Sequence, residues 1–402
     1  MRRTAIFAAM AVCVAAWALS AAPGAEIRLT VTSAAAGSDV PVSTKVTLPA
    51  DLADTPPEQL AVTMKPADGA PVPGQIVREA DGEARLWWIA PAVEAGKQAK
   101  WTARLEKGKG AEGFGWKDEK GKHRDLLCAG KRITRYMYER DTSDKRRAFD
   151  TAKVYHHVFN AEGTDTITKG PGGQFPHHRG IFLGFSVSYD GKKRDDWWHA
   201  QRVSQEDRKR LRSAAGPVLG AETVLIHWLD REGKPVVVEE RETIVFRQPA
   251  STLLLLESRS LLKPARGDIE LGGDPEHAGM QFRPHNDVNR KTTKYLFPRE
   301  EVNRGNVAKE LDLPWAALCY ELKGKTYSVH HMNHPENPKG TRYSAYRDYG
   351  RFGAYPKAKI KQGESLTLKY RIWAAGGEFP SRKDLQARWE AFAKPPRVDL
   401  AK

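Results

Sequence analysis

The chain has few cysteines, and none of them belongs to a repeated spacing. It holds 3 cysteines in 402 residues, and Cys13 lies in an apolar stretch near the start. Small secreted domains that depend on disulfides carry many more, so a cysteine framework is excluded. Cys128 and Cys319 could form one disulfide in an oxidising compartment or remain two buried thiols, and the sequence leaves both open.

Motifs of several common enzyme classes are also missing. No Gly-x-Ser-x-Gly is present, which disfavours a serine nucleophile on a strand-to-helix elbow. No glycine-rich loop stands between an expected strand and an expected helix, so a nucleotide site is not predicted. A helical His-Glu-x-x-His pair is absent too, which weakens the prediction of a metal site.

Residues 1–25 have the pattern of a secretory signal peptide. Two arginines precede an apolar stretch from Ala5 to Leu19, and small residues follow. This stretch is shorter than the roughly 20 residues of a membrane span, although a retained N-terminal anchor is the alternative. We expect cleavage between Ser20 and Ala25 and an exported protein, periplasmic or secreted, with no stable membrane span in the mature chain.

The chain is basic, with a formal net charge of +15. A basic exported protein can bind acidic glycans or anionic surfaces. The basic residues are scattered and do not alternate with aromatic ones, so nucleic acid is not an expected partner. A carbohydrate or another small polar molecule is the expected ligand.

Short alternating apolar segments between proline and glycine turns predict a mainly β protein. We expect a large antiparallel β-sandwich with an N-terminal β segment and a short C-terminal helix, which Ser381 and Asp384 would cap. The predicted regions are an N-terminal β-sandwich-like segment at 26–106, a loop or linker at 107–124, a β domain with the site at 125–375, and a C-terminal helix and tail at 376–402.

Residues 175–199 are the most informative stretch of the chain. They begin Phe-Pro-His-His-Arg-Gly and end Asp-Asp-Trp-Trp-His, on either side of an apolar run from Ile181 to Val187. The run is typical of a buried strand. Imidazoles exchange protons or bind metals near neutral pH, and indoles stack on sugars. The stretch therefore predicts a polar pocket at the ends of one strand.

Most of the 12 histidines fall into four clusters. In one of them Gln281, Arg283 and His285 alternate, which would place them on one face of a strand. Convergence of several clusters in one pocket is expected, since catalytic sites gather titratable groups. The clustered histidines are His156, His157, His177, His178, His199, His277, His285, His330, His331 and His334.

Roles follow from residue type. Acid/base catalysis on a sugar would use His178 and His277, with Glu276 as the carboxylate partner. A bound divalent metal would take its ligands from His178, His199, His277 and His334. Arginines would clamp an anion or hydroxyl, tryptophans would stack on the ligand, and His334 would close the site. The expected substrate-binding residues are Arg179, Trp197, Trp198, His199, Gln281, Arg283 and His334.

Four ordered motifs resemble the PmoA-like domain family over roughly residues 125–375. They are Pro176-His-His-Arg-Gly180, Asp195-Asp-Trp-Trp198, Pro275-Glu-His277-x-Gly279-x-Gln-x-Arg283 and Asn333-His-Pro335-x-Asn-Pro338. The resemblance implies an exported bacterial protein found beside carbohydrate-degrading enzymes, with a β-rich fold like the galactose-mutarotase supersandwich. The family name implies methane oxygenation. That activity is not expected here, because the subunit so named crosses the membrane several times and this mature chain has no span.

Three functions stay open at this point, beside the interpretation that the histidines and arginines only satisfy loops of a structural domain. The leading one is an exported carbohydrate-active enzyme, a hydrolase, lyase or epimerase, with acid/base catalysis in a pocket lined by His, Arg and Trp. A non-catalytic carbohydrate-binding sandwich would keep the tryptophans but would not need the histidines. A metal-dependent oxidoreductase or hydrolase would need several imidazoles around one ion.

Overall fold

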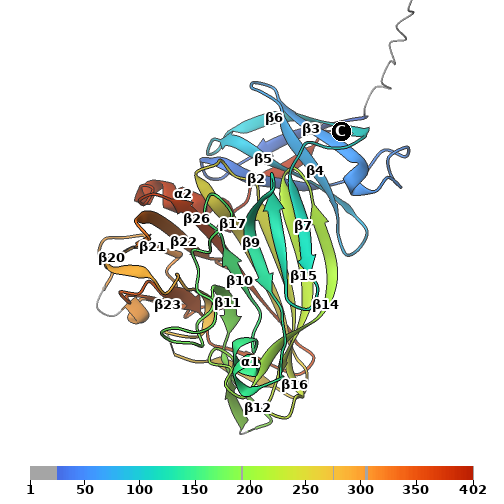
Figure 1. Cartoon of the computed structure of the whole chain (residues 1–402). Helices are drawn as coiled ribbons and strands as arrows, with labels where there is room; N and C mark the ends of the chain where they lie inside the picture. The colour runs from blue at the N-terminus through green and yellow to red at the C-terminus, as the bar shows by residue number, and fades with distance from the viewer. Residues whose placement is uncertain (1–24, 192, 275, 304–306, 402) are drawn as a thin grey trace, which may run out of the picture.

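The computed structural model describes residues 25–191, 193–274, 276–303 and 307–401. The expected signal peptide at 1–25 lies outside the described residues except for Ala25. The fold is mainly β, as predicted, and its named strands pair antiparallel in four sheets (Figure 1). Among the described residues, no helix is long and apolar enough to cross a membrane.

The N-terminal sheet has 7 strands in the order β2-β5-β4-β3-β6-β1-β27. It forms a core of its own, in which the rings of Trp88 and Trp101 lie 5.9 Å apart. β27 comes from the C-terminal end and pairs with β1, so the chain returns to its first sheet. The strands are β1 Ala25–Thr32, β2 Gly37–Val46, β3 Leu60–Pro66, β4 Val72–Arg78, β5 Ala84–Val93, β6 Gln98–Lys107 and β27 Arg397–Leu400, with a 3-10 helix η1 at Pro57–Gln59.

Two eight-stranded sheets form the predicted sandwich. The first sheet has the order β23-β24-β19-β11-β10-β9-β8-β7, and the second has the order β14-β15-β16-β17-β26-β22-β21-β20. The first comprises β7 Phe114–Glu119, β8 His123–Cys128, β9 Lys131–Met137, β10 Tyr155–Val158, β11 Ile181–Gly184, β19 Gly279–Phe282, β23 Arg342–Ala345 and β24 Phe352–Tyr355. The second comprises β14 Ser204–Ala215, β15 Leu219–Leu229, β16 Pro235–Phe246, β17 Thr252–Pro264, β20 Val288–Leu296, β21 Trp315–Leu322, β22 Lys325–Asn333 and β26 Leu366–Gly376.

Apolar side chains of both large sheets share one core. Leu126 and Phe282 of the first sheet belong to the same buried cluster as Ile226 and Leu318 of the second. This is the arrangement that alternation in both sets of strands predicts, because every second side chain faces the partner sheet. A small sheet in the order β13-β12-β18-β25 adds to the sandwich; its strands are β12 Ser186–Tyr189, β13 Lys193–Asp196, β18 Ile269–Gly272 and β25 Ala358–Ile360.

The C-terminal helix α2 runs from Arg382 to Ala393, and a short helix α1 covers Lys145–Asp150. Another 3-10 helix, η2, covers Val307–Lys309. The Ser381 side chain accepts a hydrogen bond from the backbone N–H of Asp384, as the sequence predicted. α2 packs on the second sheet through Leu385 and Phe392, close to the N-terminal sheet (Figure 1).

Two sequence-based expectations are settled by these elements. The segment 107–124 is not a loop throughout, because Phe114–Glu119 forms β7 and pairs with β8 at the edge of the first sheet. Glycines and lysines in that stretch suggested a linker, but Phe114 is buried in the sandwich core. Cys128 and Cys319 are free thiols that belong to different sheets.

Several clustered histidines are structural. His156 is buried against Tyr136, with ring centroids 5.0 Å apart. In His331, Nε2 lies 3.1 Å from the carbonyl oxygen of Met280. Burial lowers the pKa of His156 to about 3 and the pKa of His331 to about 4. His157, half-buried on β10, also has its pKa lowered to about 3, chiefly by desolvation. These imidazoles are neutral parts of the fold at neutral pH.

The stability of the protein should fall as the pH drops from about 6.5 towards 4. In that window the unfolded chain protonates these three imidazoles while the folded chain does not, so protons favour unfolding. Each contributes about 1.4 kcal/mol per pH unit, so the three together contribute about 4 kcal/mol per pH unit. Urea unfolding at pH 7.0 and 5.5 measures the difference. His156→Phe should flatten the dependence, and a midpoint that does not move between these pH values would contradict the prediction.

Candidate functional site

The candidate site lies on the outer face of the first eight-stranded sheet. Met280 and Phe282 of β19 are packed in the sandwich core, so alternation turns Gln281 to the opposite face. Arg283 follows just after the strand and contacts His178, which precedes β11. The loops around β11, β13 and β19 therefore carry the site residues to one place.

Three histidines from these three loops come together. The ring centroids of His177 and His199 are 4.2 Å apart, and those of His199 and His277 are 5.2 Å apart. The centroids of His177 and His277 are 5.6 Å apart. One ring nitrogen of each lies within 4.8 Å of the others, so the group could hold a metal ion. We call these residues the histidine triad.

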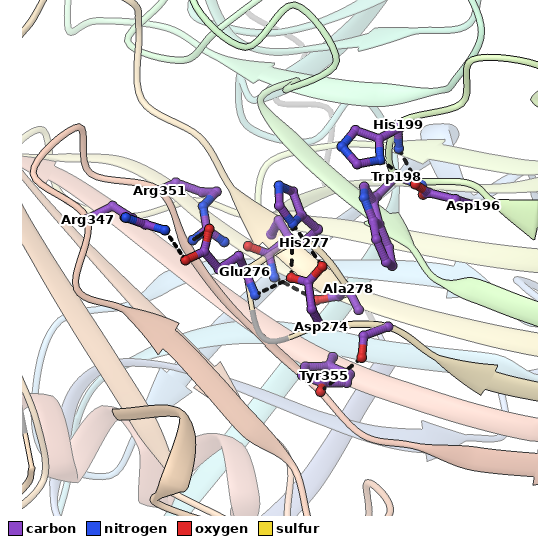
Figure 2. Close-up of polar contacts among 12 residues, drawn as sticks. Asp196, Trp198, His199, Asp274, Glu276, His277, Ala278, Arg347, Arg351 and Tyr355 are labelled. Atoms are coloured by element: carbon purple, nitrogen blue, oxygen red, sulfur yellow. Dashed lines mark hydrogen bonds and ion pairs between the residues drawn. The ribbon is translucent and has the colours of Figure 1, made fainter. Parts of the chain in front are cut away.

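Carboxylates orient two members of the histidine triad. Asp196 accepts a hydrogen bond from Nδ1 of His199, and Asp274 Oδ1 lies 2.9 Å from Nδ1 of His277 (Figure 2). Imidazoles that donate through Nδ1 present the lone pair of Nε2, which is the usual arrangement around protein-bound zinc. The triad with its two aspartates therefore fits a divalent metal better than a purely structural cluster.

His177, the third member, is also available as a ligand. Its Nε2 is buried and has no hydrogen-bond partner among the described residues. Burial, and next the Lys153 ammonium, lower the pKa of His177 to about 2. The ring is therefore neutral at physiological pH, and neutral imidazole is the form that binds metals.

The two aspartates share a local geometry. Asp196 Oδ1 accepts backbone N–H groups of Trp198 at 2.9 Å and His199 at 3.0 Å. Asp274 Oδ1 accepts the backbone N–H of Glu276 at 2.8 Å. Each carboxylate is thus fixed by its own turn before it meets the imidazole three residues later.

Replacing Asp274 with asparagine should weaken metal binding about 10- to 100-fold, because the amide no longer holds the His277 imidazole in one tautomer and orientation. Titration of the metal-free protein with zinc measures the affinity. Asp287→Asn is the matched control, since Asp287 pairs with His285 outside the triad at 3.5 Å. Equal affinities in the two variants would contradict this role of Asp274.

His178 lies beside the triad, as expected, but its environment changes its predicted role. Its ring centroid is 4.3 Å from that of His177, and its Nδ1 accepts a hydrogen bond from Arg283 Nε at 2.7 Å. Burial, and next the Arg283 guanidinium, hold the pKa of His178 far below its ordinary value. The ring is neutral, with its proton on Nε2, and that atom is buried without a partner. It can donate a hydrogen bond to a ligand.

Glu276 is not the carboxylate partner of His277; Asp274 has that position. Glu276 accepts hydrogen bonds from Tyr346 and Arg347 instead. Burial alone would raise the pKa of Glu276, but these two bonds lower it below its ordinary value. The group is therefore an ionised carboxylate held by arginine, which is not the state of a general acid.

Two residues that the sequence placed in contact with substrate are structural. Arg179 is fully buried and donates to backbone carbonyls, among them those of His178 at 2.9 Å and Asp150 at 3.1 Å. Trp197 is also fully buried, and its Nε1 donates to the carbonyl of Ser204. Neither has a free face for a ligand, so both expectations are corrected.

The other predicted substrate-binding residues lie either beside the histidine triad or in the buried interior. Trp198 stacks on His277 with centroids 5.5 Å apart and planes at 17°, so the imidazole covers that indole face. Gln281 is buried and donates to the carbonyl of Ala278 at 2.6 Å. His334 does not close the site: it packs on Phe392 of α2, with ring centroids 5.0 Å apart. The structure therefore does not bring the 330–338 motif to the triad.

Sequence reasoning missed His177 as a ligand, the two orienting aspartates, and Arg351. One signal was present for the aspartates, since Asp-x-x-His occurs at Asp196–His199 and again at Asp274–His277. An aspartate three residues before a histidine can fold back on it in a turn. No local pattern could have identified Arg351, whose surroundings come from distant parts of the chain.

The fold and site define an antiparallel β-sandwich protein with a histidine- and carboxylate-lined site among arginines. The chain belongs to a family of unknown function, DUF6807, whose model matches residues 123–390. This range contains the 125–375 region that carries the sequence motifs, and the PmoA name that those motifs suggested does not appear in its description. Comparison with curated proteins gave no match.

Among solved structures, the chain is similar to a protein in the glycosyl hydrolase family 38 from Enterococcus faecalis. The TM-score is 0.45 and the sequence identity is 10%. The match covers 94% of this chain and 47% of the other, so the chain spans about half the length of that protein.

Proposed function

We propose that this protein is an exported, metal-dependent enzyme that acts on a carbohydrate, as a hydrolase, lyase or epimerase. The observation that carries the proposal is the histidine triad with Asp196 and Asp274 on two of its Nδ1 atoms. Three imidazoles, two of them hydrogen-bonded through Nδ1 to carboxylates, are the donor set of catalytic zinc and related metals. The carbohydrate and the export come from the sequence motifs and from residues 1–25.

The histidine triad would hold the metal, and a metal bound there would supply Lewis-acid polarisation of a substrate oxygen. The residues of the chain then divide the remaining tasks. Asp196 and Asp274 keep the imidazoles oriented, and His178 offers its Nε2–H as a hydrogen-bond donor beside the triad. Arg283 keeps the proton of His178 on Nε2 by donating to Nδ1.

The alternative of a non-catalytic sugar-binding sandwich has less support. It depends on an exposed aromatic platform, but Trp197 is buried in the core and Trp198 is covered on one face by His277. Sugar-binding proteins without catalysis also have no need for oriented, metal-competent imidazoles.

Metal analysis of protein purified without a histidine tag tests the proposal, followed by assays on a panel of glycans and modified sugars. We expect about one zinc, copper, iron or manganese ion per chain. Turnover should be lost with a chelator and restored by the metal. If the metal-free protein turns over substrate and added metal does not change the rate, metal dependence is overturned. If the metal-loaded protein binds sugars without turnover, the sugar-binding alternative is favoured.

A further inference from the structure

Buried cations outnumber free carboxylates around the histidine triad. The buried cationic side chains of this region are Lys153, Lys169, Arg179, Arg283 and Arg351. Of the nearby acids among the described residues, Asp196 and Asp274 bind histidines, Glu276 binds Arg347, and Asp150 pairs with Arg146 at 3.7 Å. Burying a cation without a counter-charge is costly, so the region has an excess of positive charge that the fold alone does not explain.

Most of these cations are satisfied by neutral acceptors. Lys153 donates to the carbonyl of Trp198, Lys169 donates to the carbonyl of Gly172, and Arg283 Nη1 donates to the carbonyl of Tyr349 at 2.6 Å. Burial lowers the pKa of Lys169 to about 8 and the pKa of Arg283 to about 9. A lowered pKa is expected for a buried cation that has no anion close to it.

Arg351 differs because its donors are unused. Its side chain is 2% exposed, and none of Nε, Nη1 and Nη2 has a hydrogen-bond partner among the described residues. Its Nη2 is 3.8 Å from Glu276 Oε2, which is too long for a hydrogen bond. A guanidinium has five N–H donors, and leaving them unpaired in a protein interior is expensive.

The place of Arg351 connects it to the triad. Figure 2 shows Arg351 next to Glu276, which directly precedes His277 in the chain. Glu276 joins the buried Arg351 to Arg347, whose side chain is 43% exposed. Glu276 therefore lies between the exposed Arg347 and the unused donors of Arg351. A ligand anion that displaced the Glu276 carboxylate would reach these donors.

We propose, on the basis of the proposed function, that the substrate carries an oxyanion and that Arg351 binds it. A planar guanidinium with free Nε and Nη donors matches two oxygens of a carboxylate, sulfate or phosphate through paired hydrogen bonds. The substrate class is then an acidic sugar, such as a uronic acid or a sulfated or phosphorylated sugar. The basic net charge of the chain, +15, favours the approach of such a ligand.

Calorimetric titration of the metal-loaded full-length protein tests this assignment. The probes are glucuronate and galacturonate, glucose 6-sulfate, glucose 6-phosphate, and neutral glucose and galactose. At least one acidic sugar should bind at least tenfold more tightly than the neutral sugars, and the probe that binds best identifies the oxyanion. Arg351→Met should abolish this binding, and Arg351→Lys should weaken it at least tenfold because it loses the paired donors.

Two further variants test the same inference without changing the buried Arg351, whose substitution can impair folding. Glu276→Gln removes the competing carboxylate and should tighten acidic-sugar binding several-fold. Arg342→Gln, on the neighbouring strand β23, should leave binding unchanged. All variants are compared for circular dichroism and for metal content, which the Arg351 substitutions should not alter.

Neutral sugars that bind as well as acidic ones would overturn the inference. So would unchanged acidic-sugar binding in Arg351→Met, or no binding of any acidic probe at millimolar concentration. A protein that binds acidic sugars through Arg351 but holds no metal would refute the proposed function and keep this inference. A protein that holds metal but does not distinguish acidic from neutral sugars would refute this inference and keep the proposed metal dependence.

Discussion

Replacing His177 with alanine should reduce the metal content from about one ion per chain to nearly none. His177 supplies the member of the triad whose Nε2 is buried and free of any described partner, and its ring is closest to His199, at 4.2 Å between centroids. With it removed, two imidazoles remain, and two ligands hold a divalent ion far more weakly than three. We expect at least a 100-fold loss of zinc affinity, a larger effect than removal of an orienting carboxylate.

Elemental analysis and competitive zinc titration measure this loss, and His227→Ala is the matched control. His227 lies on β15, in the second sheet, and is not part of the triad. Removal of metal should also lower the thermal midpoint of the wild-type protein, because a ligand that binds only the folded state stabilises it. Wild-type metal content in His177→Ala would refute the assignment of the triad.

Arg351→Met should make the ligand-free protein more stable while it removes acidic-sugar binding. Arg351 is a buried cation with unused donors, and the Glu276 carboxylate beside it is 3.8 Å away and shared with Arg347. A methionine of similar length fills much of the space without the cost of desolvating a charge. The free energy of unfolding should rise by about 1–3 kcal/mol, the usual cost of buried donors without partners.

Urea unfolding with and without the best acidic sugar measures both effects together. The sugar should raise the unfolding midpoint of the wild-type protein and leave that of Arg351→Met unchanged. Leu262→Met, a buried apolar change on β17, controls for repacking of a large side chain. A marked loss of stability in Arg351→Met would mean that the guanidinium supports the fold, and it would contradict a role reserved for the ligand.

The class of the fold could be predicted from local patterns. Alternating apolar positions, with turn residues between them, predicted a large antiparallel sandwich, and the two eight-stranded sheets confirm it. The helix near the end was predictable as well, because Ser381 and the apolar residues after it follow the rules of helix capping and spacing. The stretch 107–124 was missed because glycine and lysine describe its composition, whereas β7 forms by pairing with β8.

The site was predictable only in part. The motif around residues 175–199 and the one around Glu276 and His277 do meet, and both were visible in the sequence. The sequence could not show which of the two adjacent histidines belongs to the triad, because His177 and His178 are the same type of residue. The contact of His178 with Arg283, 105 residues further along, leaves His177 free to complete the triad.

The sequence by itself determined the β architecture, the capped helix and two of the motifs that supply the site, because these depend on the period and chemistry of neighbouring residues. The tertiary structure alone decided that His334 packs on α2, that Trp197 and Arg179 belong to the interior, and that Arg351 keeps its donors unused beside Glu276. The physical reason is that burial and partnership depend on which distant strands and loops come together. Local sequence fixes which groups a residue carries, and the packing of the sheets fixes what those groups meet.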